Sequence, residues 1–245
     1  IEVVQAEAYA PLHIRAASSV RLVADGDESR FDGDDSDVGF NLGLLWQPHE
    51  KHSFGINYRS GTSLNYAGQA RISGAGPLDG VTAANARFAF PQNIVAGWSY
   101  RPTPKWNLEF NLDWTDWDRL DTVTLSRSAP PAFPINFNWE SSFFYEWGVT
   151  RYFDQGWRVS GGYIFSENSV PNANFNPLVP DSDRHIFSVG IGRSYERWNW
   201  DFAYQFAHGP TRTVSGSAPS VILQSADGNY GLTSHALSFV LGYKF

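Results

Sequence analysis

The chain of 245 residues contains no cysteine and no methionine. Without cysteine it has no disulfide bridges, no thiol chemistry and no thiolate metal site. It also lacks any run of about 18 apolar residues, the length that a membrane-spanning helix needs. Its net charge is −7 and its basic residues form no cluster, which argues against nucleic acid as a partner because phosphate contacts need grouped lysine and arginine. If this chain crosses a membrane, it does so with strands.

Motifs for catalysis and metal binding are missing as well. The sequence has no G-x-S-x-G elbow, and no serine, histidine and carboxylate gather on one local element. Only His49 and His52 among the six histidines are close in the sequence, and two ligands are too few for a zinc site. The acidic segment 25–37 does not match the EF-hand template, so we interpret it as a solvated loop, with loose divalent-cation binding as the alternative. We expect no enzyme, no cofactor and no metal site.

The chain is instead rich in alternating segments and in aromatic residues. In 106–115 large apolar side chains alternate with polar ones, and this period of two recurs in most segments. A soluble domain could use one such strand to cover a core, but the pattern recurs in almost every segment and leaves no room for a shared interior. A transmembrane barrel presents the apolar face of each strand to lipid and the polar face to its lumen. The aromatic content of 16% suits girdles at two membrane interfaces. We therefore predict an all-β, antiparallel transmembrane β-barrel of the outer-membrane type.

About ten strands are predicted, in one domain that covers residues 1–245, and their connections alternate between short and long. The predicted strands are 8–24, 37–47, 53–71, 92–101, 106–126, 141–153, 157–166, 185–195, 198–214 and 233–245. The short connections are 48–52, 102–105, 154–156 and 196–197. The long connections are 25–36, 72–91, 127–140, 167–184 and 215–232. Short periplasmic turns and longer extracellular loops are typical of outer-membrane barrels.

Short motifs add a second kind of signal. The most specific is Val179-Pro180-Asp181-Ser182-Asp183-Arg184, which follows Ser169-Val170-Pro171 and leads into the strand at 185–195. The others are Ile56-Asn57-Tyr58-Arg59-Ser60, Phe90-Pro91 with Trp98 and Tyr100, Trp114 to Trp117, Ala207-His208-Gly209 and Tyr243-Lys244-Phe245. In this order they resemble the FadL family of outer-membrane transporters for long-chain fatty acids and other hydrophobic compounds. The resemblance covers most of the chain.

The resemblance implies a barrel of about fourteen strands, plugged by an amino-terminal hatch, in the bacterial outer membrane. This chain would then hold the last ten strands. Since it starts at Ile1 without a signal peptide, we expect the hatch and the first four strands to lie upstream. Ten strands from such a template leave two sheet edges unpaired unless the sheet recloses.

Charged residues on the polar faces of the strands are the candidate sites. We select Arg15, Arg59, Arg21 and Arg158 as candidates for holding a substrate carboxylate, because arginine binds carboxylates with two parallel hydrogen bonds. Arg59 and Arg15 are preferred. The alternative is that the inward charges pair across the lumen or hold the hatch, which their mixed signs favour. The inward set also includes Lys244, Glu109, Asp113, Glu146 and Asp201.

The motif residues Pro180, Asp181, Asp183 and Arg184 lie where a long loop enters a strand. A salt bridge that braces the loop is the preferred role, and direct ligand contact is the alternative.

The expected function is passive uptake of hydrophobic compounds, with long-chain fatty acids ahead of aromatic hydrocarbons because of the inward arginines. The resemblance implies that hatch movement and lateral exit through the barrel wall replace an open water channel. A water-filled porin is the alternative, and an outer-membrane lipolytic enzyme is a more distant one. As partners we expect the hydrophobic substrate, outer-membrane lipids and lipopolysaccharide, and the barrel assembly machinery through the terminal Phe245.

Overall fold

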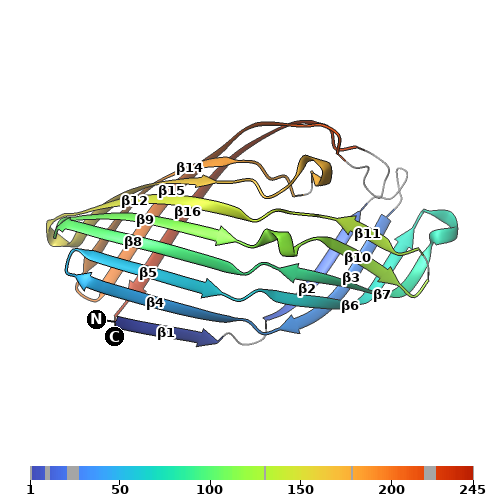
Figure 1. Ribbon diagram of the computed structural model, residues 1–245, viewed down its shortest axis with the longest axis horizontal. Coiled ribbons are helices and arrows are strands. Elements are labelled where there is room, and N and C mark those ends of the chain that lie inside the picture. Colours follow the sequence, from blue (N-terminus) through green and yellow to red (C-terminus); the bar gives the residue numbers. More distant parts are fainter. Residues whose placement is uncertain are drawn as a thin grey trace.

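Antiparallel strands make up most of the computed structural model (Figure 1). The structure describes residues 2–8, 12–20, 28–129, 131–177, 179–217 and 225–244. The helices within these ranges are short 3₁₀ turns: η1 (Gly76–Leu78), η2 (Trp117–Arg119), η3 (Asp154–Gly156) and η4 (Asn172–Asn174). No helix of the described ranges has the length and apolar character needed to span a membrane. The predicted all-β antiparallel class is confirmed.

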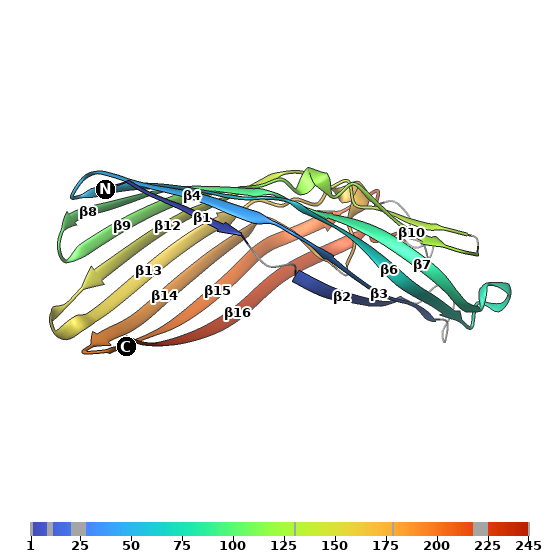
Figure 2. The same cartoon turned by 90° about the horizontal axis from the view of Figure 1, so that it is seen from below.

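Ten strands form the larger sheet. In sheet order they are β1 (Glu2–Ala8), β4 (Phe40–His49), β5 (His52–Arg59), β8 (Asn93–Thr103), β9 (Trp106–Thr115), β12 (Ser142–Tyr152), β13 (Trp157–Ser166), β14 (Arg184–Tyr195), β15 (Trp198–Val214) and β16 (Gly228–Tyr243). The sheet curls, so that β15 and β16 pass behind the front strands in Figure 1. Figure 2 shows β1 and β16 at separate edges, and no ladder joins them among the described residues. Nine strands of this sheet lie where strands were predicted, whereas β1 was not predicted, and the two edges of the sheet are unpaired among the described residues.

Short turns join neighbouring strands at one end of this sheet. They connect β4 to β5, β8 to β9, β12 to β13 and β14 to β15, at the positions predicted. In two of them Gln155 and Glu196 have positive φ angles of 60° and 52°, a conformation found in tight turns. We call this end of the sheet the short-turn rim.

A second, six-stranded sheet extends several of these strands beyond the other end. Its order is β11 (Phe133–Asn136), β10 (Thr122–Arg127), β7 (Gly80–Phe90), β6 (Thr62–Ser73), β3 (Glu28–Asp37) and β2 (Leu12–Val20). Along the chain β3 precedes β4, β6 follows β5, β7 precedes β8 and β10 follows β9. These long strands are thus interrupted at a similar level. The prediction that 53–71 and 106–126 are continuous strands is wrong at these interruptions.

Several predicted loops are strands in this second sheet. β3 occupies most of the acidic segment predicted as a loop at 25–36, and β7 occupies half of the loop predicted at 72–91. The carboxylates of β3 favour its pairing with β6. Asp37 Oδ2 accepts a hydrogen bond from Ser63 N and Asp35 Oδ2 accepts one from Asn65 N, both at 2.6 Å. The strand predicted at 8–24 is present as β2, but it belongs to the six-stranded sheet, and β1 takes its place at the edge of the ten-stranded one. β11 and the start of β16 likewise shorten the loops predicted at 127–140 and 215–232.

Close contacts explain the interruption between β5 and β6. A Cβ atom at Gly61 would lie 2.9 Å from the Phe90 carbonyl oxygen and would collide with the Arg119 guanidinium. Across the interruption Gln92 accepts a hydrogen bond from Tyr58 (3.0 Å) and donates one to Asp116 (2.7 Å). Hydrogen bonds between side chains therefore link the strands where the regular ladder stops.

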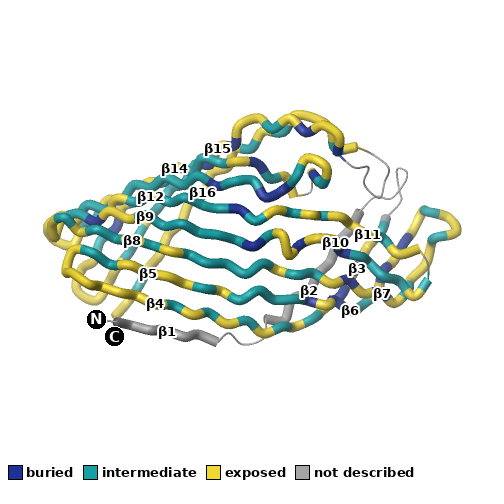
Figure 3. The backbone as a smooth tube through the Cα atoms, viewed as in Figure 1, coloured by how far each residue is buried: buried dark blue, intermediate teal, exposed yellow. Residues whose placement is uncertain are grey.

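The larger apolar core lies in the six-stranded sheet, and a smaller cluster of Val170, Phe175 and Val214 lies where the end of β15 meets the loop at 167–184. Figure 3 shows buried positions gathered around β3, β6, β7 and β10, whereas the ten-stranded sheet alternates between exposed and half-buried positions. The larger cluster comprises Phe31, Leu64, Tyr66, Ala70, Ala84, Ala86, Leu120 and Val123. Large apolar residues of the ten-stranded sheet are instead exposed, among them Leu237, Phe239, Val189 and Phe187. Such a surface needs lipid to cover it.

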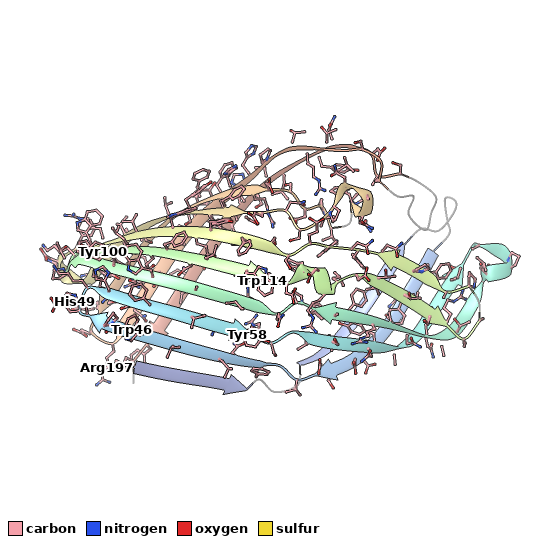
Figure 4. All side chains as sticks on the ribbon, viewed as in Figure 1. Trp46, His49, Tyr58, Tyr100, Trp114 and Arg197 are labelled. Carbon is pink, nitrogen blue, oxygen red and sulfur yellow. The ribbon has the colours of Figure 1, made fainter. Side chains whose placement is uncertain are left out.

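Aromatic side chains mark two levels of the exposed apolar face. In Figure 4 Trp46 and Tyr100 lie toward the short-turn rim, and Tyr58 and Trp114 lie toward the level of the strand interruptions. Ring contacts extend both groups, for example Trp46 with Phe54 and Phe40 with Tyr58. Two aromatic belts on either side of an apolar band are the expected girdles of a membrane barrel.

Candidate functional site

The candidate site is the polar face of the ten-stranded sheet. Because the apolar face must meet lipid, we call the opposite face the inner face. The register sets Leu45, Gly55, Gly97 and Asn111 side by side across β4, β5, β8 and β9. A groove of about 310 Å³ lies over this row. Its lining comprises Gly43, Leu44, Leu45, Gly55, Ile56, Asn57, Val95, Gly97 and Asn111.

Glycines form the floor of this groove, and apolar and amide side chains form its sides. Leu45 and Val95 offer apolar contact, while Asn57 and Asn111 offer hydrogen bonds. A few polar groups on a largely apolar surface are typical of sites for small hydrophobic ligands. The groove can therefore accommodate part of a hydrophobic molecule with a weakly polar end.

Arg59 is the cation next to this groove. It is the next inner-face residue after Asn57 on β5, and it pairs in register with Asn41 and Asn93. Its side chain is exposed, and within the described part of the chain no hydrogen bond or ion pair involves it. The preferred candidate of the sequence analysis is thus available to bind an anionic group.

Arg158 is placed differently, because it is paired with a carboxylate. Its guanidinium forms a salt bridge with Asp201 and donates a hydrogen bond to Ser194 Oγ at 2.9 Å. Gly192 lies between Arg158 and Asp201 in register, and a Cβ atom there would collide with Asp201. The inward charges Arg158 and Asp201 thus pair with each other, but within the wall across β14 and not across the lumen as the alternative had it.

Three carboxylates on the inner face are bonded by asparagines. Asn107 Nδ2 donates to Glu109 at 2.8 Å, Asn111 Nδ2 donates to Glu146 at 3.2 Å, and Asn93 donates to Asp113. In the described ranges no salt bridge reaches any of these three acids. The middle of the inner face therefore carries negative charge next to the groove.

The structure describes only part of the remaining candidates, Arg15 and Arg21. Residue 15 lies in β2, opposite Asp34 of β3, so it belongs to the six-stranded sheet and not to the ten-stranded wall where we expected it. The side chain of Arg15, and Arg21 and Phe245 as a whole, lie outside the described residues. Among the candidate cations that the structure describes, Arg59 alone lies next to the groove.

The Pro180 to Arg184 motif lies at the entry to β14 and is tied to the preceding loop. Arg184 contacts Asp181 at 3.2 Å, and the Asp181 carboxylate accepts a hydrogen bond from Ser169 N at 2.9 Å. Asp183 accepts one from Asn168 N at 2.8 Å. These contacts hold both ends of the loop at 167–184 together.

Arg212, on β15, is a residue that the sequence analysis missed. Its guanidinium donates to the Asp181 carbonyl oxygen and to Asn168 Oδ1, both at 2.6 Å, and lies 5.0 Å from the centre of the Phe175 ring. Burial lowers its pKa, and the charges of Asp181 and Asp183 oppose that shift. No local signal marks this arginine, because its contacts come from residues about 30 to 45 positions earlier in the chain.

Comparison with known proteins places this geometry in a family. The sequence profile described as outer membrane protein transport protein (OMPP1/FadL/TodX) matches residues 10–245. The long-chain fatty acid transport protein of Escherichia coli K12 is 20% identical over 231 residues, which are 89% of this chain and 49% of that protein. The corresponding Salmonella typhi protein is 19% identical over 243 residues, 92% of this chain and 52% of that protein. The chain thus spans about half the length of the curated relatives it matches.

Solved structures agree on the fold. A Pseudomonas aeruginosa FadL homologue superposes with a TM-score of 0.79 at 19% identity, over 89% of this chain and 54% of the homologue. The Ralstonia pickettii toluene transporter TbuX superposes with a TM-score of 0.65 at 13% identity, over 99% of this chain and 62% of the transporter. The match over nearly the whole chain, together with the lipid-facing wall, shows that this protein is an outer-membrane β-strand protein of the OMPP1/FadL/TodX transport family.

Proposed function

We propose that the protein takes part in passive uptake of hydrophobic compounds across the outer membrane, with long-chain fatty acids as the preferred class. Three observations support this: the family, the apolar groove on the inner face, and the position of Arg59 beside it. The observation that carries the choice of substrate is Arg59. Arg59 is two residues from Asn57 on the same strand, so a carboxylate bound by Arg59 would lie about 7 Å from the groove.

Arginine suits this role because its planar fork donates two hydrogen bonds to a carboxylate. Leu45 and Val95 then supply apolar contact for the first carbons of the acyl chain. The relative from Escherichia coli is named for long-chain fatty acids, which is consistent with this assignment but belongs to that protein.

Neutral aromatic hydrocarbons are a second candidate class. Glu109, Asp113 and Glu146 face the lumen without a salt bridge in the described ranges, and negative charge disfavours the passage of an anion but not of a neutral molecule. The TbuX structure, which shares the fold, is described as a toluene transporter. The two classes differ in whether they need Arg59.

Binding to Arg59→Gln in the complete protein separates the two classes. We expect the dissociation constant for oleate to rise about 10- to 100-fold, the loss of a charge-assisted hydrogen-bonded contact, while that for toluene stays unchanged. Arg71→Gln, on the exposed face of the six-stranded sheet, is the matched control and should change neither constant. Equal weakening for both ligands would contradict the role of Arg59. Saturable toluene binding with no oleate binding to the parent protein would favour the second class.

Conductance tests the transport class itself. A protein of this type is expected to pass no steady ion current in a planar bilayer, whereas a water-filled porin does. Stable ohmic conductance of the complete protein would overturn the uptake proposal whatever the result at Arg59.

A further inference from the structure

Two arginines near the short-turn rim have the same aromatic surroundings. The guanidinium carbon of Arg151, on β12, lies 4.8 Å from the ring centre of Trp106 and 5.2 Å from that of Phe153. The guanidinium carbon of Arg193, on β14, lies 5.0 Å from Trp157 and 5.2 Å from Tyr195. In both cases one ring is two residues further along the chain, at or just after the end of the strand, and the other is a tryptophan that starts the neighbouring strand. We call these two groups the arginine sandwiches.

Both sandwiches lie on the apolar face of the wall. Arg151 continues the alternation of Trp147 and Val149, and Arg193 continues that of Val189 and Ile191, all four of which are exposed. An arginine in contact with lipid is costly in the middle of a bilayer, but close to the interface its long side chain can reach the polar layer. The turns at 153–156 and 196–197 follow within a few residues, so both cations lie at that interface.

The described part of the chain places no carboxylate in a salt bridge with either guanidinium. The nearby carboxylate of Asp154 contacts Lys105 at 3.7 Å. Arg193 Nε donates one long hydrogen bond, to the Gln155 carbonyl oxygen at 3.3 Å. The rings cover the faces of each guanidinium and leave its N–H edge for another acceptor.

We propose that the two arginine sandwiches bind the phosphate groups of anionic phospholipids in the periplasmic leaflet. Short turns mark the periplasmic end of an outer-membrane barrel, so the lipid that meets this rim is a phospholipid. A phosphate accepts two parallel N–H bonds from a guanidinium, as a carboxylate does. The tryptophan and the second ring hold the fork in place and pack against the first part of the acyl chain.

This assignment is independent of the transported substrate, since it uses the lipid-facing side of the wall. Four aromatic rings and two cations at one rim also have a mechanical consequence. They fix the height of β12 to β14 relative to the membrane surface, while the neighbouring rim at His52, Trp98 and Tyr100 has stacked rings without an arginine. Lipid binding is therefore expected on one part of the rim and not all around it.

The test compares lipid retention by the complete protein and its variants. Each is reconstituted with phosphatidylglycerol and phosphatidylcholine, extracted in mild detergent and examined by native mass spectrometry. We expect retained phosphatidylglycerol in Arg151→Gln/Arg193→Gln to fall about five-fold per site, the equivalent of about 1 kcal/mol for each cation. Arg197→Gln removes the same charge from the turn beside β14. Among the described residues no ring packs on the Arg197 guanidinium, so this variant should retain as much lipid as the parent protein.

Two further arms keep the outcome decisive. Arg193→Lys preserves the charge and the fold but loses the planar fork, so it should retain less phosphatidylglycerol than the parent and more than Arg193→Gln. Inorganic phosphate should not displace the lipid, because it lacks the chain that packs on the rings. Equal retention by the parent and the double variant, or an equal loss in Arg197→Gln, would overturn the proposal. Displacement by inorganic phosphate would do the same, since it would show a phosphate site without lipid specificity.

Discussion

The ten-stranded and six-stranded sheets use several of the same long strands but distribute apolar residues in opposite ways. On β6, in the six-stranded sheet, Leu64 is 3% exposed, whereas Leu237 on β16 of the ten-stranded sheet is 71% exposed. The six-stranded sheet buries its apolar face against its own chain, as proteins in water do. The ten-stranded sheet leaves its apolar face to lipid and keeps polar groups inside. The same residue type therefore has a different energetic role on either side of the strand interruptions.

Leu64→Ala is the change with the largest expected effect. The substitution removes buried methyl groups from the core of the six-stranded sheet and should destabilise that sheet by about 2–5 kcal/mol. Hydrogen exchange of the β6 and β7 amides measures the loss, because local opening of this sheet exposes them. Leu237→Ala is the matched control, and it should leave amide protection in both sheets nearly unchanged. A similar loss in both variants would remove the distinction between the two sheets.

Val189→Arg and Val81→Arg test the opposite side of the comparison. Val189 and Val81 are 61% and 51% exposed, so burial alone predicts the same small effect for both. If β14 faces lipid, an arginine at 189 costs about 2–4 kcal/mol. On β7 an arginine at 81 reaches water and costs less than about 1 kcal/mol even though Arg71 lies opposite it. Urea unfolding from lipid vesicles gives both values, and equal costs would show that Val189 does not contact lipid.

On the β14 and β15 side the strands continue into loops, where polar contacts of Arg212 accompany a small apolar cluster. Arg212→Gln removes the donors to Asn168 and to the Asp181 carbonyl oxygen and should destabilise the loop at 167–184 by about 1.5–3 kcal/mol. Faster proteolytic cleavage within this loop measures the effect. Arg71→Gln serves as the control for loss of charge. Unchanged cleavage of Arg212→Gln would mean that Phe175 and Val170, which pack with Val214, hold the loop without the arginine.

The features that the sequence could predict are those that repeat with period two. Apolar side chains face lipid and polar ones face the lumen, so the alternation along the sequence predicts the wall strands and their short turns. It also predicts that Arg59 and Glu109 face inward. β3 could not be predicted in this way, since its acidic side chains hydrogen-bond to the backbone of β6 and hide the alternation. The pairing of Arg158 with Asp201 depends on the register across β14, and the role of Arg212 depends on a distant loop. Contacts between residues so far apart in the sequence can be identified only from the three-dimensional structure.

Asp227 gives the smallest of the expected effects, and it concerns the loop that precedes β16. Its carboxylate accepts hydrogen bonds from Ser217 Oγ at 2.7 Å, Ser217 N at 2.9 Å and Gly216 N at 3.1 Å, which lower its pKa to about 2. Because the folded pKa lies below the ordinary value of 3.8, the ionised form stabilises the loop above that value. This contribution is lost as the pH falls toward 2.

The titration can be followed at the amides that the carboxylate binds. The chemical shifts of the Gly216 and Ser217 amide protons should change with a midpoint near pH 2, and in Asp227→Asn they should stay constant over the same range. A midpoint near the ordinary value in the parent protein would show that these hydrogen bonds do not persist in solution. The amides of β6, whose sheet is held by apolar packing, should not respond in this range, because protonating Asp227 removes a polar contact from its own loop and leaves the buried cluster around Leu64 unchanged.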